Sequence, residues 1–323
     1  MSLANVMECG SYEINLIKQV DSPINRKLIV SGAHVNTISR TATDCTGFSI
    51  EEIIGSGGFG SVFLGRFGGT KVAVKTLHKS TKNVMASKQS FCAEMNVIGL
   101  NHENLVNVMA TTTLEDFDSG ALIVMEYVGK RNLLQTINDS TINMPIMQCI
   151  RYGIDIGRAL DYLHAQGIIH LDIKPANIFI TDNERCKIGD FGCTQRIAQA
   201  SIETPRRRNR RGLAGTVAYR APELLRGKTA TTKADVYSMG VTLWQMFVRE
   251  TPYEGQDHHV VVFSVVAKKQ RPRFPEEMSI TSEWYKNLCV ACWGCSPEDR
   301  PDADHVMNIL QQRLKGYSDA DNA

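Results

Sequence analysis

An acid, a cation and an amide lie within six positions in the stretch that reads His-Leu-Asp-Ile-Lys-Pro-Ala-Asn: Asp172, Lys174 and Asn177. A second acid, Asp190, follows thirteen residues later in an Asp-Phe-Gly triplet. A carboxylate can orient a hydroxyl, a lysine can balance negative charge, and an amide with a carboxylate can bind a hard metal ion. The set is suited to transfer of a phosphoryl group. The alternative is a polar loop in which proline stops a helix and the acids cap turns.

A second candidate phosphate-binding segment is rich in glycine. Gly55, Gly57 and Gly60 leave room for backbone amides to approach phosphate oxygens. The alternating patterns of 48–54 and 62–67 predict strands on both sides of these glycines, whereas a dinucleotide-binding glycine motif would open a helix. A flexible hairpin turn is the alternative explanation of such spacing.

Lys75 is the next candidate. It ends the run Val-Ala-Val-Lys in a third predicted strand, 71–77, after a tight turn at Gly68-Gly69. A lysine in an apolar strand is costly to bury unless it is paired. Glu94 lies beside the apolar stripe of a predicted helix over 85–100 and is the candidate partner. The alternative for Glu94 is a solvated helix glutamate.

The remaining patterns say which elements position these groups. Alternation predicts two more strands, over 105–110 and 121–127, which makes a small antiparallel sheet of five strands with one helix. Gly129 begins a linker, and a short hairpin-like segment precedes Asp190. Apolar residues at helical spacing predict helices over 145–166, within 229–249, and over 257–268, 281–292 and 302–314. A β-rich segment therefore precedes a helical one.

Composition limits the class of protein. The 323 residues are 43% hydrophobic and 22% charged, as in ordinary globular proteins, and the net charge of +2 does not favour a nucleic-acid partner. Nine scattered cysteines fit a reducing compartment better than a disulfide framework. No apolar run approaches the roughly 18 residues needed to span a bilayer, and no signal peptide is indicated. We expect a cytoplasmic protein without a membrane or nucleic-acid partner.

Five motifs occur in a characteristic order: Gly55-x-Gly-x-x-Gly-x-Val62, Val-Ala-Val-Lys75, His170-x-Asp-x-Lys-x-x-Asn177, Asp190-Phe-Gly and Ala221-Pro-Glu223. Together they resemble the motif set of the eukaryotic protein kinases. The resemblance implies an α+β, bilobal protein-kinase fold over 47–316, with a small β-rich N-lobe to about 128 and a larger, mainly helical C-lobe. Residues 1–46 would be a flexible or loosely docked extension, and 317–323 a C-terminal tail.

The resemblance also implies ATP and Mg²⁺ as cofactors and assigns roles to individual residues. Asp172 and Lys174 would be catalytic, and Asn177 and Asp190 would bind Mg²⁺. Lys75, oriented by Glu94, would hold the α- and β-phosphates. The nucleotide-binding set would comprise Ile54, Gly55, Ser56, Gly57, Gly58, Phe59, Gly60, Val62, Ala73, Lys75, Glu94, Met125, Glu126, Val128 and Phe179.

Within this set, Ile54, Val62, Ala73 and Phe179 would sandwich the adenine. The backbone of Glu126 and Val128 would bind the adenine edge, with Met125 behind it. Outside the set, the resemblance implies a structural ion pair between Glu223 and Arg300. It also implies that Asp235 bonds to the backbone of the catalytic loop.

The segments Lys174-Pro-Ala-Asn177 and Gly215-Thr-x-x-Tyr219 resemble those of serine/threonine kinases. The resemblance implies that serine or threonine hydroxyls accept the phosphoryl group. Shorter matches over 80–97 and at Cys193 resemble the Mos group, germ-cell kinases that activate a MAP kinase kinase. They imply a monomeric MAP kinase kinase kinase of oocyte meiotic maturation or arrest, with a MAP kinase kinase as its protein substrate. The alternatives are a pseudokinase scaffold, or another activator of a MAP kinase kinase outside the Mos group.

Three features differ from the protein-kinase motif set or lie outside it. Leu171 replaces the arginine that in many kinases binds an activation-loop phosphate, so we expect activity without that phosphorylation. Five arginines between Arg206 and Arg211 could steer acidic substrates or act as a nuclear-localisation signal; a solvated, disordered surface is the alternative. Cys289, Cys292 and Cys295 have zinc-like spacing, but apolar packing is the favoured interpretation because a fourth ligand is lacking.

Overall fold

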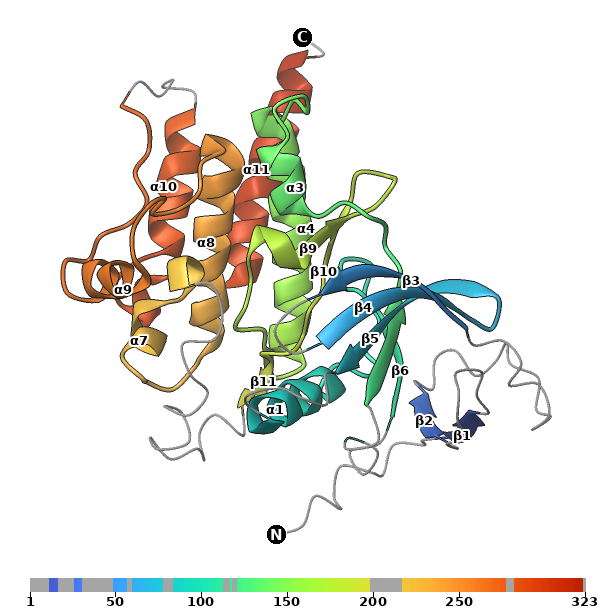
Figure 1. The fold of residues 1–323 in the computed structure, drawn as a ribbon. Coiled ribbons are helices and arrows are strands. Elements are labelled where there is room, and N and C mark those ends of the chain that lie inside the picture. Colours follow the sequence, from blue (N-terminus) through green and yellow to red (C-terminus); the bar gives the residue numbers. More distant parts are fainter. Residues whose placement is uncertain are drawn as a thin grey trace. The chain divides into compact units, whose positions relative to one another are not determined.

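The computed structural model describes residues 12–16, 26–30, 49–56, 60–77, 84–112, 117, 121–197, 217–276 and 282–321. The chain forms two compact units. The first unit comprises Met1–His102 and Val106–Val128, and the second comprises Glu103–Leu105 and Gly129–Ala323. The first is rich in strands and the second in helices, as the sequence predicts (Figure 1).

The first unit is built on a seven-stranded sheet in which every pairing is antiparallel. The order is β1-β2-β6-β7-β5-β4-β3. Two strands, β1 (Tyr12–Leu16) and β2 (Arg26–Val30), fall within the expected N-terminal extension and were not predicted. The five predicted strands are present as β3 (Ser49–Ser56), β4 (Gly60–Phe67), β5 (Thr70–Leu77), β6 (Val108–Thr112) and β7 (Leu122–Glu126).

Strand alternation gives this sheet two different faces. The turn between β4 and β5 is formed by Gly68 and Gly69, both at positive φ, as the tight hairpin turn requires. Side chains of alternate residues point to opposite faces of a sheet. One face carries a buried apolar cluster of Val72, Val74, Ala110, Leu122 and Val124. Lys75, which alternates with Val74 along β5, therefore lies on the opposite face of the sheet.

Two element boundaries in this part of the chain differ from the prediction. Helix α1 (Val84–Met95) ends five residues before the predicted position, because its last bonds tighten into turns that end at Gly99, at φ 84°. Strand β6 begins at Val108 and not at residue 105. Leu105 belongs to the second unit, where its backbone bridges to Ile188.

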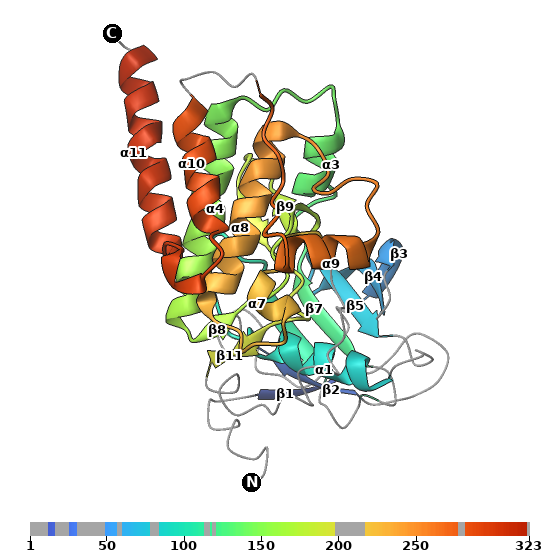
Figure 2. The ribbon, with the colours of Figure 1, turned by 90° about the vertical axis from the view of Figure 1, so that its left-hand side faces the viewer.

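The second unit has helices at its centre. α4 (Ile146–Ala165), α8 (Thr232–Val248), α10 (Glu283–Cys292) and α11 (Ala303–Asp321) run alongside one another (Figure 2). Shorter helices are α3 (Leu133–Asn138), α7 (Pro222–Leu225) and α9 (His258–Val266). The five predicted helices are present as α4 and α8–α11, with α11 extending seven residues past the predicted end. Among the described residues, no helix is long and apolar enough to cross a membrane.

Helix α8 is the most deeply buried of these elements. Thirteen of its residues are buried, and its apolar residues surround the axis instead of forming one stripe. Arg249, at φ 62°, caps the C-terminal end of α8 and donates to the carbonyl oxygens of Ile137, Asp139 and Ile142, at and after the end of α3. The helix is thus held at both its sides and its end, which makes it a rigid support for the loops that contact it.

Those loops are anchored by two short antiparallel strand pairs. β9 (Ile178–Ile180) pairs antiparallel with β10 (Cys186–Ile188), the hairpin expected before Asp190. β8 (Ile168–Ile169) pairs with β11 (Gln195–Arg196), and a 3₁₀ turn, η3 (Pro175–Asn177), leads into β9. The candidate residues Asp172, Lys174 and Asn177 therefore lie between β8 and β9, and Asp190 follows β10.

Candidate active site

In the first unit, Lys75 is paired with Glu94. Lys75 Nζ lies 2.6 Å from Glu94 Oε1, and the Glu94 side chain is only 2% exposed. Lys75 comes from the middle of β5 and Glu94 from the buried side of α1. The predicted ion pair is present. A buried pair of this kind is costly to break, because the remaining charge would lack a partner.

Three of the predicted adenine-contacting positions share the Lys75 face of the sheet. The register places Lys75 opposite Val62 on β4, and Ala73 opposite Met125 on β7. Residues in register, and those two positions along a strand, share a face. Val62, Ala73 and Met125 therefore lie on the Lys75 face, opposite the buried apolar cluster. Ile54, in β3, is 37% exposed.

The end of β7 offers backbone groups. The amide N–H of Glu126 donates to the carbonyl oxygen of Asn107 over 2.8 Å, and Glu126 Oε2 accepts the Asn107 N–H. The Glu126 carbonyl oxygen is thus the group that could accept from an adenine edge. Val128, the last residue of the unit, precedes Gly129 at φ 140°.

The glycine-rich segment has a partly structural explanation. A side chain at Gly60 would place its Cβ 2.1 Å from the Thr76 carbonyl oxygen, so the close approach of β4 and β5 requires glycine there. Gly55 and Ser56 end β3, opposite Val62 and Ser61. Gly57, Gly58 and Phe59 lie outside the described residues. The phosphate-binding role of the segment stays a prediction.

In the second unit, Asp172, Lys174 and Asn177 converge on one carboxylate oxygen. Asp172 Oδ2 accepts from Lys174 Nζ over 2.7 Å and from Asn177 Nδ2 over 2.9 Å. Asn177 Nδ2 also donates to the Asp172 backbone oxygen. Two donors therefore fix one oxygen of the acid, which leaves Oδ1 as the atom that can accept from a substrate hydroxyl.

The backbone on the N-terminal side of Asp172 is held by Asp235, on α8. The Asp235 carboxylate, fully buried, accepts the N–H groups of His170 and Leu171, each over 2.8 Å. His164 Nε2, at the end of α4, lies 2.9 Å from the same carboxylate. The predicted bond from Asp235 to the catalytic loop is present. The role of His164 was not predicted; its position in the last turn of a helix just before the loop was the available signal.

The His170 ring joins the loop to the segment before Asp190. Its Nδ1 accepts the Asp172 N–H over 3.3 Å, so this nitrogen carries no proton. Its Nε2 then carries the hydrogen and donates to the Gly189 carbonyl oxygen over 3.2 Å. The ring also packs edge-on against Phe191. The ring therefore contacts both segments and positions them.

Asn177 and Asp190 lie at the same end of the β9–β10 hairpin. Ile178 is in register with Ile188, and the Gly189 N–H donates to the Asn177 carbonyl oxygen over 2.9 Å. Because Nδ2 of Asn177 is already engaged by Asp172, its Oδ1 is the ligand atom that remains. An amide oxygen and a carboxylate make an oxygen-only donor set, which fits Mg²⁺. Phe179 lies between these positions in β9, on the side opposite the buried Ile178 and Ile180.

Cys193 lies beside these groups. Burial raises the pKa of its thiol to about 12, with further increases from the carboxylates of Asp172 and Asp190. The thiol is therefore protonated at neutral pH and is not an activated nucleophile.

The comparisons with known proteins agree with this geometry. The protein kinase domain family matches residues 48–310. The serine/threonine-protein kinase mos of Patiria pectinifera is 48% identical over 293 residues, covering 90% of this chain and 82% of that protein. The Xenopus laevis mos kinase is 41% identical (81% and 74% covered), and the Mus musculus proto-oncogene kinase mos is 40% identical (83% and 80%). The chain belongs to the protein kinase family, in the Mos group of serine/threonine kinases.

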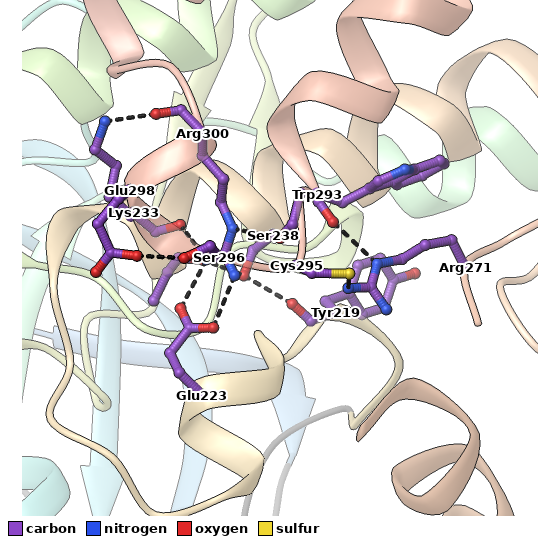
Figure 3. Close-up of polar contacts among 12 residues, drawn as sticks. Tyr219, Glu223, Lys233, Ser238, Arg271, Trp293, Cys295, Ser296, Glu298 and Arg300 are labelled. Carbon is purple, nitrogen blue, oxygen red and sulfur yellow. Dashed lines mark hydrogen bonds and ion pairs between the residues drawn. The ribbon is translucent and has the colours of Figure 1, made fainter. Parts of the chain in front are cut away.

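The expected structural ion pair of this kinase is also present. Arg300 donates through Nη1 and Nη2 to the two carboxylate oxygens of Glu223, each over 2.7 Å (Figure 3). Both side chains are almost completely buried. The pair ties the Ala-Pro-Glu segment of α7 to the segment before α11.

The zinc interpretation of the three cysteines is wrong. Cys289 and Cys292 are fully buried on α10, whereas Cys295 is exposed and accepts from Arg271 Nη2 at 3.7 Å. Within the described parts of the chain, no group of three histidine, cysteine or acidic residues could hold a metal ion. Cys289 and Cys292 pack as small apolar side chains instead. The arginine-rich stretch from Arg206 to Arg211 lies outside the described residues.

Proposed function

We propose that this kinase transfers the γ-phosphoryl group of ATP to serine or threonine hydroxyls of a MAP kinase kinase. The observation that carries the proposal is the Asp172 carboxylate, one oxygen of which is held by Lys174 and Asn177. A fixed carboxylate with one remaining acceptor oxygen is what orienting a hydroxyl for in-line attack requires.

In the proposed reaction, Asp172 Oδ1 accepts the hydrogen bond, and finally the proton, of the attacking hydroxyl. The hydroxyl oxygen forms a bond to the γ-phosphorus as the bond to the β–γ bridging oxygen breaks, and ADP leaves. Lys174, ion-paired with Asp172, also balances negative charge on the transferred group. Mg²⁺, when bound by Asn177 and Asp190, supplies charge neutralisation for the phosphates.

Lys75 is proposed to bind the α- and β-phosphates of ATP. Its ammonium group is already oriented by Glu94, which stabilises the charged form in a mostly buried place. The shared face of Val62, Ala73 and Met125 supports an apolar adenine site beside it. Removal of the Lys75 charge should therefore impair the use of ATP. Because it also leaves the buried Glu94 without this partner, a loss of stability is expected, and circular dichroism checks that the variant is folded.

The pathway is proposed from the relatives, which are named mos kinases. We place the protein, as a cytoplasmic monomer, upstream of a MAP kinase kinase in oocyte meiotic maturation or arrest. No nucleic-acid or membrane partner is proposed.

One assay tests the function. Wild-type protein and the Lys75→Met variant are incubated with ATP, Mg²⁺ and a MAP kinase kinase that cannot phosphorylate itself. We expect wild-type protein to phosphorylate serine or threonine, and the variant to lose at least about a hundredfold of the rate, as when a transition-state charge contact is removed. Lys315→Met, on the exposed side of α11, is the matched control and should keep the rate.

No transfer by wild-type protein, or equal transfer by wild type and Lys75→Met, would defeat the enzymatic proposal and favour a scaffold. Transfer to another protein but not to the MAP kinase kinase would defeat the pathway alone. Loss of rate on EDTA addition, restored by Mg²⁺, would separate the metal requirement from the choice of protein substrate.

A further inference from the structure

A cleft of about 800 Å³ lies on the second unit, lined by residues that the kinase chemistry does not use. One wall is the segment after α7, and the second is Lys269 beyond the end of α9. The third is the segment 295–298, which runs into η6 (Pro297–Asp299). The lining residues include Arg226, Lys228, Thr231, Lys269, Cys295 and Glu298. Figure 3 shows the third wall, with Cys295, Ser296 and Glu298 close to the Glu223–Arg300 pair.

The cleft has an excess of positive charge. Arg226, Lys228 and Lys269 all line it and are exposed. Arg226 uses one nitrogen, Nη2, to donate to the Val266 carbonyl oxygen over 2.7 Å, which holds its guanidinium in place. Among the residues that the structure describes, neither Lys228 Nζ nor Lys269 Nζ makes an ion pair or hydrogen bond. Two ammonium groups are therefore left to face the cleft.

The acids of the cleft do not balance all of these cations. Both carboxylate oxygens of Glu223 accept hydrogen bonds from Arg300. Glu298 accepts from the Ser296 hydroxyl, and this bond holds the pKa of the Glu298 carboxyl below its usual range, with Lys228 and Arg300 contributing. With Glu223 paired, three cations face one acid. An anion is the complementary ligand.

The start of α8 adds a second, independent preference for an anion. Thr231, which lines the cleft, is the N-cap of this seventeen-residue helix, and its side chain makes no capping hydrogen bond. The first backbone N–H groups of a helix lack partners within the helix, and its dipole favours negative charge there. The helix terminus and the lysines thus favour the same sign of charge.

The size and composition of the cleft favour a peptide. Its volume exceeds that of one phosphate group, and its cations come from two separate chain segments. No aromatic side chain lines it, as stacking of bases would require, and the net charge of the chain is only +2. We propose that this cleft binds an acidic peptide segment of a protein partner. The binding does not depend on phosphoryl transfer.

The first test measures binding of a fluorescein-labelled hexaglutamate peptide by fluorescence anisotropy at low salt. The double variant Lys228→Glu/Lys269→Glu should weaken binding about tenfold, because two exposed attractions become repulsions. Lys286→Glu/Lys315→Glu makes the same change of charge at exposed positions away from the cleft and should bind as wild type does. Equal melting temperatures check that all three proteins are folded.

The second test uses Cys295 as a reporter. Alkylation of Cys295, followed by peptide mass spectrometry, should slow when hexaglutamate is present, because the thiol lines the cleft. Cys92, also exposed but in the first unit, is the internal control and should react at an unchanged rate.

Several results would overturn the proposal. Equal binding by wild type and the cleft variant would do so, as would equal losses in the cleft and control variants. Loss of binding only when Arg206 to Arg208 are neutralised would assign the peptide to the arginine-rich stretch. Protection of Cys295 by sodium sulfate but not by hexaglutamate would make the cleft a small-anion site.

Discussion

Asp235 accepts the backbone N–H of Leu171 over 2.8 Å and thereby holds a leucine at φ 67°. A leucine in the left-handed region is strained by about 1–2 kcal/mol, so the conformation needs compensation from its surroundings. The buried Asp235 carboxylate supplies it through its bonds to Leu171, His170 and His164. The strained residue directly precedes Asp172, so the orientation of Asp172 depends on a side chain of α8.

The first prediction concerns Asp235→Asn. The amide keeps the size of the carboxylate but has one acceptor oxygen, and its NH₂ would face a backbone N–H. We expect a loss of about 1–3 kcal/mol of unfolding free energy, measured in urea, for the unsatisfied donor. The phosphorylation rate should fall even at temperatures where circular dichroism shows a folded protein.

The control for Asp235→Asn is Asp302→Asn. Asp302 pairs with Lys233 but is 68% exposed, so its change should alter stability by less than about 1 kcal/mol and leave the rate unchanged. An Asp235→Asn enzyme with the wild-type rate would show that the loop does not depend on this carboxylate.

The second prediction concerns the buried Glu223–Arg300 pair. Arg300→Met leaves Glu223 buried without its partner and should cost about 3–5 kcal/mol of unfolding free energy. The double variant Glu223→Leu/Arg300→Met removes both charges and should recover much of that loss. Urea unfolding of the two single variants and the double variant gives the coupling energy.

An exposed pair provides the comparison. Arg66 and Glu51 are 49% and 39% exposed, and Arg66→Met should cost less than about 1 kcal/mol. If Arg300→Met proved as mild as Arg66→Met, the buried pair would contribute nothing to the stability of the second unit.

The third prediction concerns pH and cysteine reactivity. Because burial raises the Cys193 pKa to about 12, iodoacetamide at pH 7.5 should label Cys295 well before Cys193. Raising the pH from 7.5 to 9.5 increases the Cys193 thiolate fraction about tenfold per unit, so its labelling should rise in proportion. Mass spectrometry of the labelled peptides measures both rates. Fast labelling of Cys193 at neutral pH would contradict the predicted environment.

The raised pKa of Cys193 also makes the stability of the protein depend on pH. The folded protein disfavours the thiolate, so the contribution of protonated Cys193 to stability is complete below its unfolded pKa, near 9.0. That contribution is lost as the pH rises from 9 toward 12. Cys193→Ala should therefore reduce the alkaline fall in unfolding free energy, with wild type measured in parallel.

The fourth prediction concerns Leu171, whose side chain cannot bind a phosphate. Phosphatase treatment of purified protein should leave its activity unchanged, because the residue before Asp172 is a leucine and not an arginine that would need a phosphorylated loop as its partner. Leu171→Arg is the informative variant, because it places before Asp172 the arginine that in many kinases binds an activation-loop phosphate. Abolition of wild-type activity by phosphatase would refute the prediction.

The sequence by itself indicated which residues form the candidate site. Lys75 needed a partner because an unpaired ammonium is costly to bury, and the position of Glu94 beside the apolar stripe of the predicted helix made it the candidate. The spacing of Asp172, Lys174 and Asn177 in one short loop kept them close whatever surrounded them. Alternation and helical periodicity likewise predicted β3–β5, α4 and α8, because their patterns are long and regular.

Only the tertiary structure decided what depends on distant contacts. β1 and β2 have weak patterns of their own and are identified by the pairing of β1 with β2 and of β2 with β6. Leu105 leaves the predicted strand because its backbone pairs with Ile188. The bond from His164 to Asp235 spans 71 residues, and the cleft joins Lys228 to Lys269 and Cys295. Local propensity carries no information about such pairs. They form because packing α4, α8 and α10 together brings their ends and connecting loops within bonding distance.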